Sequence, residues 1–166
     1  MKRLLPIVMT ATTLPFAALT AQAEGNRLPD TLYIGAGFSQ NVIDSPWGGS
    51  EDATGYSLFG GMEFDNSVEG LTSSVEIGYS DTGDFYDNSD SDINGPWAAL
   101  VGKKSLPEID PRLSVLGRIG LDLGDDDGLL LGAGVGFDPM DKLGLRAEFI
   151  NKDASSVYQI SALLHF

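Results

Sequence analysis

The sequence predicts an all-β protein: an eight-stranded, antiparallel, up-and-down transmembrane β-barrel. Three observations lead to this fold class. Segments of about 9–11 residues alternate between apolar and small or polar residues, with Gly, Asp, Asn, Ser or Pro between them. No segment after the N-terminal region approaches the roughly 18–20 apolar residues of a spanning helix. The last segment, "SSVYQISALLHF" (155–166), alternates up to the final residue, although chain ends are usually polar and frayed.

Residues 1–23 are predicted to be a secretory signal peptide. Lys2 and Arg3 precede an apolar stretch rich in Ala, Thr and Leu, and Ala21-Gln22-Ala23 provides an A-x-A cleavage site. The remaining chain, 24–166, is short enough to be one barrel domain. It keeps eight basic and all 24 acidic residues, so its formal net charge becomes −16. This charge argues against a nucleic-acid partner. The absence of cysteine excludes disulfide stabilisation and a lipid-anchored cysteine.

In each of the eight segments the apolar residues occupy one parity, which places them on one face of a strand. The first is typical: Leu32, Ile34, Ala36 and Phe38 oppose Tyr33 and three small residues. In the fourth segment we expect Ala98 and Leu100 to face outward and Lys103 inward. The predicted strands span 31–40, 54–64, 71–80, 96–106, 112–123, 128–137, 142–150 and 155–166.

The connections also alternate in character. Those after even-numbered strands are short, at 65–70, 107–111 and 138–141. Those after odd-numbered strands are more polar, and two of them are long, at 41–52, 80–95, 122–128 and 151–155. This rhythm is typical of a membrane barrel with tight turns at one end and loops at the other.

The second face of the strands distinguishes a membrane barrel from a soluble sandwich. A water-facing surface would be rich in Lys, Glu, Thr and Arg, but here this face carries mostly Gly and Ser with isolated charges. Small residues suit the narrow interior of eight strands, and single charges of opposite sign can pair there. The predicted lumen charge network is Glu63, Glu76, Lys103, Arg118, Arg146 and Glu148. These residues either line a narrow pore or, as we expect, fill a plugged barrel.

Aromatic residues of the apolar face gather toward the strand ends, where interfacial girdles are found in membrane barrels. The predicted rim consists of Tyr56, Phe64, Tyr79, Trp97, Phe137, Phe149, Tyr158 and Phe166.

The whole chain after residue 23 resembles the small outer-membrane β-barrel family of Gram-negative bacteria, which includes the transmembrane domain of outer-membrane protein A and its X-type relatives. The resemblance lies in "LYIGAGFS", "YSLFGGMEF", "SSVEIGYSD", "LSVLGRIGLDL" and "YQISALLHF". It implies an outer-membrane location with both termini periplasmic, and contact with periplasmic chaperones. It also implies that the barrel-assembly machinery reads the last strand through Tyr158, Ile160, Ala162, Leu164 and Phe166. The chain lacks the peptidoglycan-binding domain of larger members, so such anchoring is not implied.

Two loops are strongly acidic. One carries Asp81, Asp84, Asp87, Asp90 and Asp92, and the other carries Asp122, Asp125, Asp126 and Asp127. The stretch "DSDING" (90–95) begins like a calcium loop, but Val101 stands where that motif needs Glu. The loops are therefore either solvated or open sites for Ca²⁺ or Mg²⁺, which could bridge carboxylates to lipopolysaccharide.

The residues give little support for catalysis. The single histidine, His165, lies beside the C-terminus, at the end of the barrel opposite the loops, so no Ser-His-Asp set can form there. We expect no enzyme and no cofactor. The sequence favours a monomeric outer-membrane protein with a structural or surface-interaction role, in membrane integrity or adhesion. A narrow ion or solute pore and a lipid-modifying enzyme are the alternatives.

Overall fold

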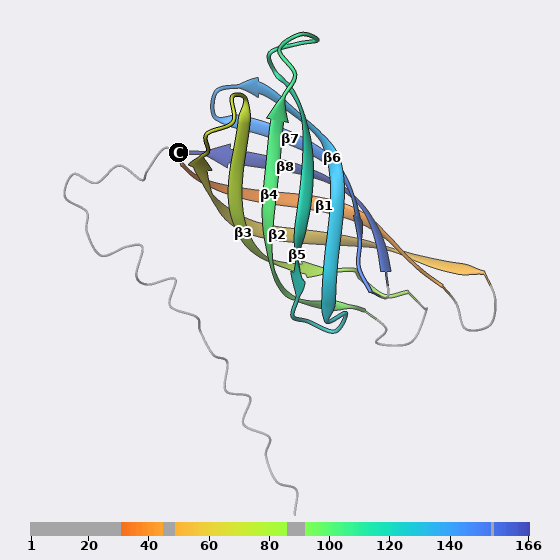
Figure 1. Ribbon diagram of the computed structural model, residues 1–166. Helices are drawn as coiled ribbons and strands as arrows, with labels where there is room; N and C mark the ends of the chain where they lie inside the picture. Colours follow the sequence, from red (N-terminus) through yellow and green to blue (C-terminus); the bar gives the residue numbers. More distant parts are fainter. Residues whose placement is uncertain (1–30, 45–48, 86–91, 154) are drawn as a thin grey trace, which may run out of the picture.

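A computed structural model describes residues 31–44, 49–85, 92–153 and 155–166. Within these ranges the chain forms a closed barrel in which every strand pairs antiparallel with its neighbours in sequence, and β8 pairs with β1 (Figure 1). The predicted fold class is confirmed. The strands are β1 (Leu32–Asp44), β2 (Ser50–Asp65), β3 (Leu71–Asp81), β4 (Asn94–Ser105), β5 (Leu113–Asp122), β6 (Gly128–Met140), β7 (Leu143–Asn151) and β8 (Ser155–His165).

The side-chain parity of all eight strands agrees with the alternation in the sequence. Apolar side chains such as Ile34, Phe38 and Ile160 are exposed on the outer wall, whereas Tyr33 and Leu163 are buried inside. Within the described residues no helix is long and apolar enough to cross a membrane.

The two ends of the barrel differ. We call the end with the short β2–β3, β4–β5 and β6–β7 connections the turn end, and the opposite end the loop end. Both β1 and β2 extend further toward the loop end than predicted, since Asn41–Asp44 pair with Ser50–Ala53. Pairing of β2 with β3 begins only at Tyr56, so the β1–β2 hairpin projects beyond its neighbour (Figure 1). The added stretches, NVID (41–44) and SEDA (50–53), mix polar and apolar residues, because backbone pairing, unlike lipid contact, does not require an apolar outer face.

One rim residue was predicted on the wrong face. Trp97 is buried in the lumen, not in the outward aromatic rim, because Ala98 and Leu100 face outward as expected and adjacent strand positions alternate. Its ring lies over Gly78 of β3, and the ring of Phe59 lies beside Gly35 of β1 in the same way. A Cβ at either glycine would collide with the aromatic ring, so these glycines make room for large rings in a narrow barrel.

The last strand closes the barrel. From Tyr33 to Ile43, β1 pairs with the stretch of β8 from His165 to Ser155. Strand β8 ends at His165, and the N–H of Phe166 continues the pairing by donating to the carbonyl of Leu32. The predicted signal peptide, 1–23, lies outside the described residues.

Candidate functional site

The lumen holds a buried ion cluster contributed by three strands. Glu76 of β3 receives hydrogen bonds from Arg146 of β7 at 2.5 Å and from Arg118 of β5 at 2.7 Å. Arg118 also lies 3.2 Å from Glu148. All four side chains are almost completely buried, and two positive charges balance two negative ones. We call these four residues the central cluster.

Aromatic rings complete the environment of the central cluster. The Tyr33 hydroxyl donates to Glu76 at 2.5 Å, and the Arg146 guanidinium lies 5.4 Å from the centre of the Tyr33 ring. The Arg118 guanidinium lies 5.0 Å from the Trp97 ring. Such cation–π contacts stabilise a cation that has lost its water.

The predicted network of six charges is divided into two groups. The structure brings Glu76, Arg118, Arg146 and Glu148 together, but it places Glu63 and Lys103 toward the turn end. Lys103 lies 3.9 Å from Glu63 and 3.4 Å from Asp138, and these side chains are partly exposed. His165 is half-buried at the same end and stacks on Tyr33 with ring centres 5.1 Å apart.

Toward the loop end, the lumen is filled by apolar side chains. Phe59 and Trp97 contact each other with ring centres 5.8 Å apart. They belong to one buried group with Leu130, Ile150 and Val157, which we call the apolar layer. It stands between the central cluster and the loop end. Eight strands leave only enough interior for side chains, so this packing closes the lumen.

Beyond the apolar layer, two residues of the predicted acidic loop 122–128 are held inside. Asp122 receives a hydrogen bond from Lys152 at 2.6 Å, and Asp126 receives one from Ser155 at 2.8 Å. Both acids are buried. They were missed as lumen partners because Lys152 and Ser155 are 30 and 29 residues away and belong to no strand that pairs with β5, so only closure of the barrel brings them close.

Several buried polar atoms have no hydrogen-bond partner among the described residues. Arg118 Nε and Glu148 Oε1 are close but not aligned for a hydrogen bond, and the hydroxyls of Ser57, Ser114 and Ser161 and the amide nitrogen of Gln159 are also unpaired. Arg118 still donates to Glu148 through its Nη2 at 3.3 Å, so each ion pair of the cluster contains a hydrogen bond, and Glu76 is the best-satisfied member.

No group of three or more His, Asp or Glu side chains in the described ranges is arranged to hold a metal ion. Of the acidic loop residues, Asp87 and Asp90 lie outside the described residues. Asp125 and Asp127 are exposed.

One ionisable pair lies outside the spanning strands, in the turn between β4 and β5. Hydrogen bonds from the Arg112 side chain and backbone lower the pKa of the Asp110 carboxyl to about 2. The Arg112 guanidinium lies 2.9 Å from Asp110 and 5.1 Å from the centre of the Phe137 ring, which fixes this turn to β6.

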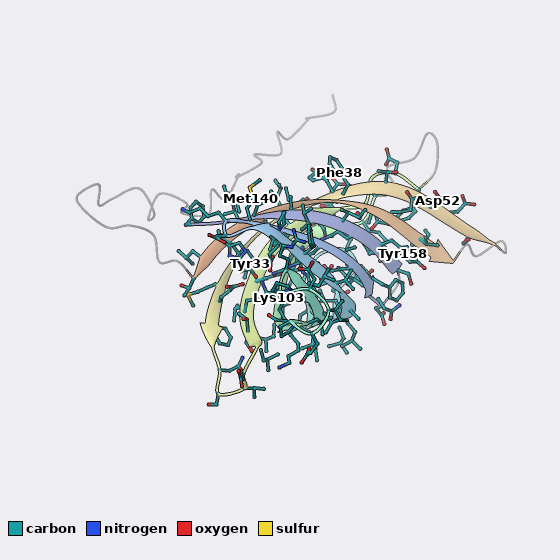
Figure 2. All side chains as sticks on the ribbon, turned by 90° about the horizontal axis from the view of Figure 1, so that it is seen from above. Tyr33, Phe38, Asp52, Lys103, Met140 and Tyr158 are labelled. Atoms are coloured by element: carbon teal, nitrogen blue, oxygen red, sulfur yellow. The ribbon has the colours of Figure 1, made fainter. Side chains whose placement is uncertain are left out.

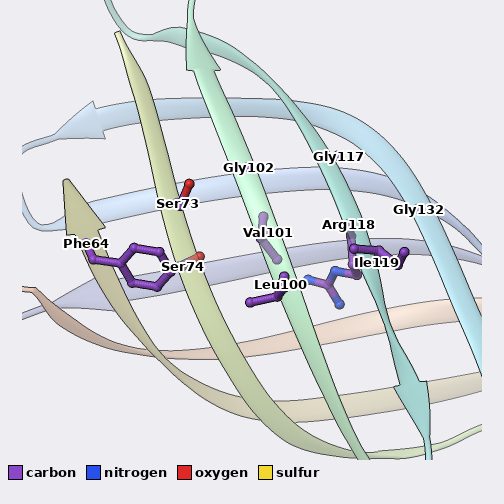
Figure 3. Close-up of a pocket in the computed structure, with 10 residues that line it drawn as sticks. All are labelled: Phe64, Ser73, Ser74, Leu100, Val101, Gly102, Gly117, Arg118, Ile119 and Gly132. Carbon is purple, nitrogen blue, oxygen red and sulfur yellow. The ribbon is translucent and has the colours of Figure 1, made fainter. Parts of the chain in front are cut away.

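The outer wall has a shallow hollow of about 390 Å³ that crosses β3, β4 and β5 (Figure 3). Paired small residues, Ser73, Gly102 and Gly117, form its floor, and Phe64, Leu100 and Ile119 form its rim. It contains no outward-facing charged group and supplies no chemistry.

The chain matches the model of the outer membrane protein beta-barrel domain over residues 9–159, and it belongs to this family. It is therefore an outer-membrane β-barrel protein. No curated protein matches its sequence.

Solved structures show the same fold at low sequence identity. The attachment invasion locus protein Ail of Yersinia pestis aligns with a TM-score of 0.54 and 16% identity, covering 81% of this chain and 96% of Ail. Neisserial surface protein A aligns with a TM-score of 0.52 and 16% identity, covering 82% of this chain and 97% of that protein. A de novo designed transmembrane β-barrel aligns with a TM-score of 0.53 and 16% identity over 86% of this chain and 100% of the design.

Proposed function

We propose that this protein is a non-conducting outer-membrane barrel whose role is structural or lies in surface contact through its loop end. The observation that carries this proposal is the filled lumen. The central cluster occupies the middle, and the apolar layer follows it toward the loop end. A solute path would have to break buried ion pairs and separate packed rings, so the surface beyond the membrane is left as the functional part.

The distribution of exposed charge indicates what the loop end can contact. Within the described residues, the exposed basic side chains lie at the turn end, at Lys104, Arg112 and Lys142. Exposed acids at the loop end include Asp52, Asp125 and Asp127. A surface of this sign attracts cationic partners and repels polyanions.

This expectation differs from what is known of one structural neighbour. Ail of Yersinia pestis has been crystallised with the heparin analogue sucrose octasulfate, which is a polyanion. The acidic loop end of this chain favours basic protein segments or divalent cations that bridge it to lipopolysaccharide. Adhesion to sulfated glycans is not part of the proposal.

Export and assembly form a second part of the proposal. Residues 1–23 direct export and are removed, and periplasmic chaperones deliver the chain with the turn end and both termini facing the periplasm. The barrel-assembly machinery then reads the outward residues of β8, Tyr158 to Leu164 in alternate positions, together with Phe166. The folded protein acts as a monomer.

The test uses the folded protein in planar bilayers and then in lipid nanodiscs. We expect no steady single-channel current. We also expect nanodiscs carrying the protein to bind immobilised poly-lysine, with binding lost as salt rises, and not to bind immobilised heparin. The Asp125→Asn/Asp127→Asn variant should weaken poly-lysine binding. The matched control, Glu69→Gln/Asp141→Asn at the turn end, removes the same charge and should retain it.

Each alternative function has its own signature. Steady open-channel current would favour a pore and contradict the filled lumen. A changed acyl pattern of lipid A after deletion of the gene would favour a lipid-modifying enzyme, an activity that the residues of the lumen and loops do not support. Heparin binding would contradict the expectation drawn from the acidic loop end, but not the filled lumen.

A further inference from the structure

Three buried polar side chains without a hydrogen-bond partner among the described residues lie close together, beside the seam where β8 closes on β1. They are Ser57 of β2 and Gln159 and Ser161 of β8. Gly37 of β1 pairs with Ser57 on one side and with Ser161 on the other, so the two serines flank a position that has no side chain. We call Ser57, Gln159 and Ser161 the seam group.

The seam group faces the lumen and not the lipid. Its three members are at most 6% exposed. Phe38 and Tyr158, which alternate with this inner face along β1 and β8, are 77% and 57% exposed. Figure 2 shows Phe38 and Tyr158 on the outside of the wall, whereas Tyr33 lies inside it. The partner of the seam group must therefore come from within the barrel.

The seam group adjoins the central cluster. Gln159 pairs with Glu148 of β7 and Ser161 pairs with Arg146, so the Cβ atoms of each pair are about 4.5–5.5 Å apart on the inner face. The Glu148 carboxylate accepts a hydrogen bond from Arg118 at 3.3 Å through Oε2, but its Oε1 has no hydrogen-bond partner within the described residues. An unpaired acceptor of the central cluster thus lies beside the unpaired amide nitrogen of Gln159.

The space over Gly37 differs from that over a neighbouring glycine of the same strand. A Cβ at Gly35 would lie 2.3 Å from the ring of Phe59, which fills the lumen at that level. At Gly37 the nearest atoms belong to the adjacent strands, and they include Ser57 Oγ at 3.1 Å and Ser161 Cβ at 3.0 Å from such a Cβ. The lumen over Gly37 is therefore bordered by polar groups and not covered by a ring.

The chemistry of these groups selects what can bind there. The amide nitrogen of Gln159 donates, Glu148 Oε1 accepts, and the two serine hydroxyls do both. The central cluster already balances two positive charges with two negative ones, so an ion beside it would be a buried charge without a counterion. A small neutral molecule that both donates and accepts fits, and ordered water commonly bridges such groups inside proteins.

We propose that the seam group binds ordered water, which bridges it to Oε1 of Glu148 across the space over Gly37. The water joins the inner faces of β2, β7 and β8. The closing strand is thereby held through its inward side chains as well as through backbone pairing. This site is additional to the proposed function, which depends on the ion pairs and rings of the lumen and on the loop end.

A double-variant cycle tests whether the seam group shares a bound partner. The protein is folded into lipid vesicles, and urea unfolding of Ser57→Ala, Ser161→Ala and the double variant is followed by heat-modifiable gel migration. The two hydroxyls make no direct hydrogen bond, so coupling between them reports a shared partner. The unfolding equilibrium constant of the double variant should differ about three- to tenfold from the product of the single effects, because the second deletion costs little once the bridge is broken.

Ser114 provides the matched control. Its hydroxyl is also buried and unpaired among the described residues, but it lies on β5 opposite Gly136 of β6, away from the seam group. Ser57→Ala and Ser114→Ala should therefore combine to within about twofold of the product of their single effects. Every variant removes only hydroxyl oxygens, so the chemical change itself cannot explain a difference between the two cycles.

A second measurement detects the water directly. Residues 24–166 contain two glutamines, Gln40 and Gln159, so their side-chain amides are easily distinguished by NMR. In nanodiscs, the amide of the buried Gln159 should give a cross-peak to water with the sign of a long-lived complex. The amide of the exposed Gln40 should show only exchange with bulk water.

Three results would overturn the proposal. If Ser57→Ala and Ser161→Ala each raise stability and their effects multiply independently, the hydroxyls are buried without any partner. Equal coupling in the Ser57/Ser161 and Ser57/Ser114 cycles would reflect a general response of the lumen. A Gln159 amide without a water cross-peak would mean that it bonds directly to Glu148. None of these results bears on conductance or on binding by the loop end, so the proposed function is tested separately.

Discussion

Replacing Glu76 by Gln is predicted to destabilise the barrel strongly. Glu76 is completely buried and accepts hydrogen bonds from Tyr33, Arg118 and Arg146. Without its charge, the two buried arginines retain only Glu148, and the central cluster carries one unbalanced positive charge. Breaking a buried ion pair in this way costs about 3–5 kcal/mol in soluble proteins.

The matched control is Glu63→Gln, which makes the same chemical change in the same lumen. Glu63 is 22% exposed and lies 3.9 Å from Lys103. After the change, Lys103 still has the Asp138 carboxylate 3.4 Å away as a partner. A partly solvated pair of this kind contributes about 0–1 kcal/mol. The free energy of unfolding should therefore fall by several kcal/mol in one variant and hardly change in the other.

The assay is reversible urea unfolding in lipid vesicles, followed by heat-modifiable gel migration. A second variant covers the case in which Glu76→Gln does not fold. Glu76→Gln/Arg146→Met restores the charge balance, so it should be more stable than the single variant despite carrying one more change. A loss below 1 kcal/mol for Glu76→Gln, or a double variant no better than the single, would refute the view that charge balance holds the cluster.

Three further predictions follow from other parts of the barrel. Trp97→Ala should lower the free energy of unfolding by about 3–5 kcal/mol and produce brief currents in planar bilayers. A variant that is as stable as the unmodified protein and passes no current would show that the apolar layer does not close the barrel. The pKa of Asp110 lies below its ordinary value of 3.8 and near 2, so its favourable contact is present above pH 3.8 and is lost as the pH falls through about 2. NMR titration of the Asp110 carboxyl should show the lowered pKa in the unmodified protein and a return toward 3.8 in Arg112→Met. An equally low pKa in Arg112→Met would show that the contact with Arg112 is not its cause. Deleting Phe166 should reduce the heat-modifiable, membrane-inserted fraction more than any loop change, and normal assembly without it would argue against an assembly signal in the last strand.

The fold was predictable because alternate residues of each strand in a membrane barrel face the lipid and the lumen, and the two sets differ in polarity. The outward parity of Leu113, Val115 and Ile119, and the inward parity of Arg118, needed only the period of a strand. Strands β1 and β2 were predicted too short, because the residues at their outer ends do not alternate cleanly between apolar and polar and are held by backbone hydrogen bonds, which leave no pattern in the sequence.

The charged residues of the lumen were predictable from the sequence, but their contacts with one another were not. All six predicted lumen charges lie on the inward parity, yet which of them meet depends on the stagger between strands. Glu76 and Arg146 are 70 residues apart and come together only across the lumen. Trp97 was assigned to the outer rim because its type suits a membrane interface, and only its place on β4 shows that it packs against Arg118.

By itself, the sequence determined the number of strands, the face of most side chains and the difference between the two ends, since these depend on local alternation and on turn residues. The tertiary structure alone decided that four charges form one balanced cluster and that an apolar layer closes the lumen beyond it. Closure of the barrel sets the register of all eight strands together, and only that register brings distant inward residues into contact.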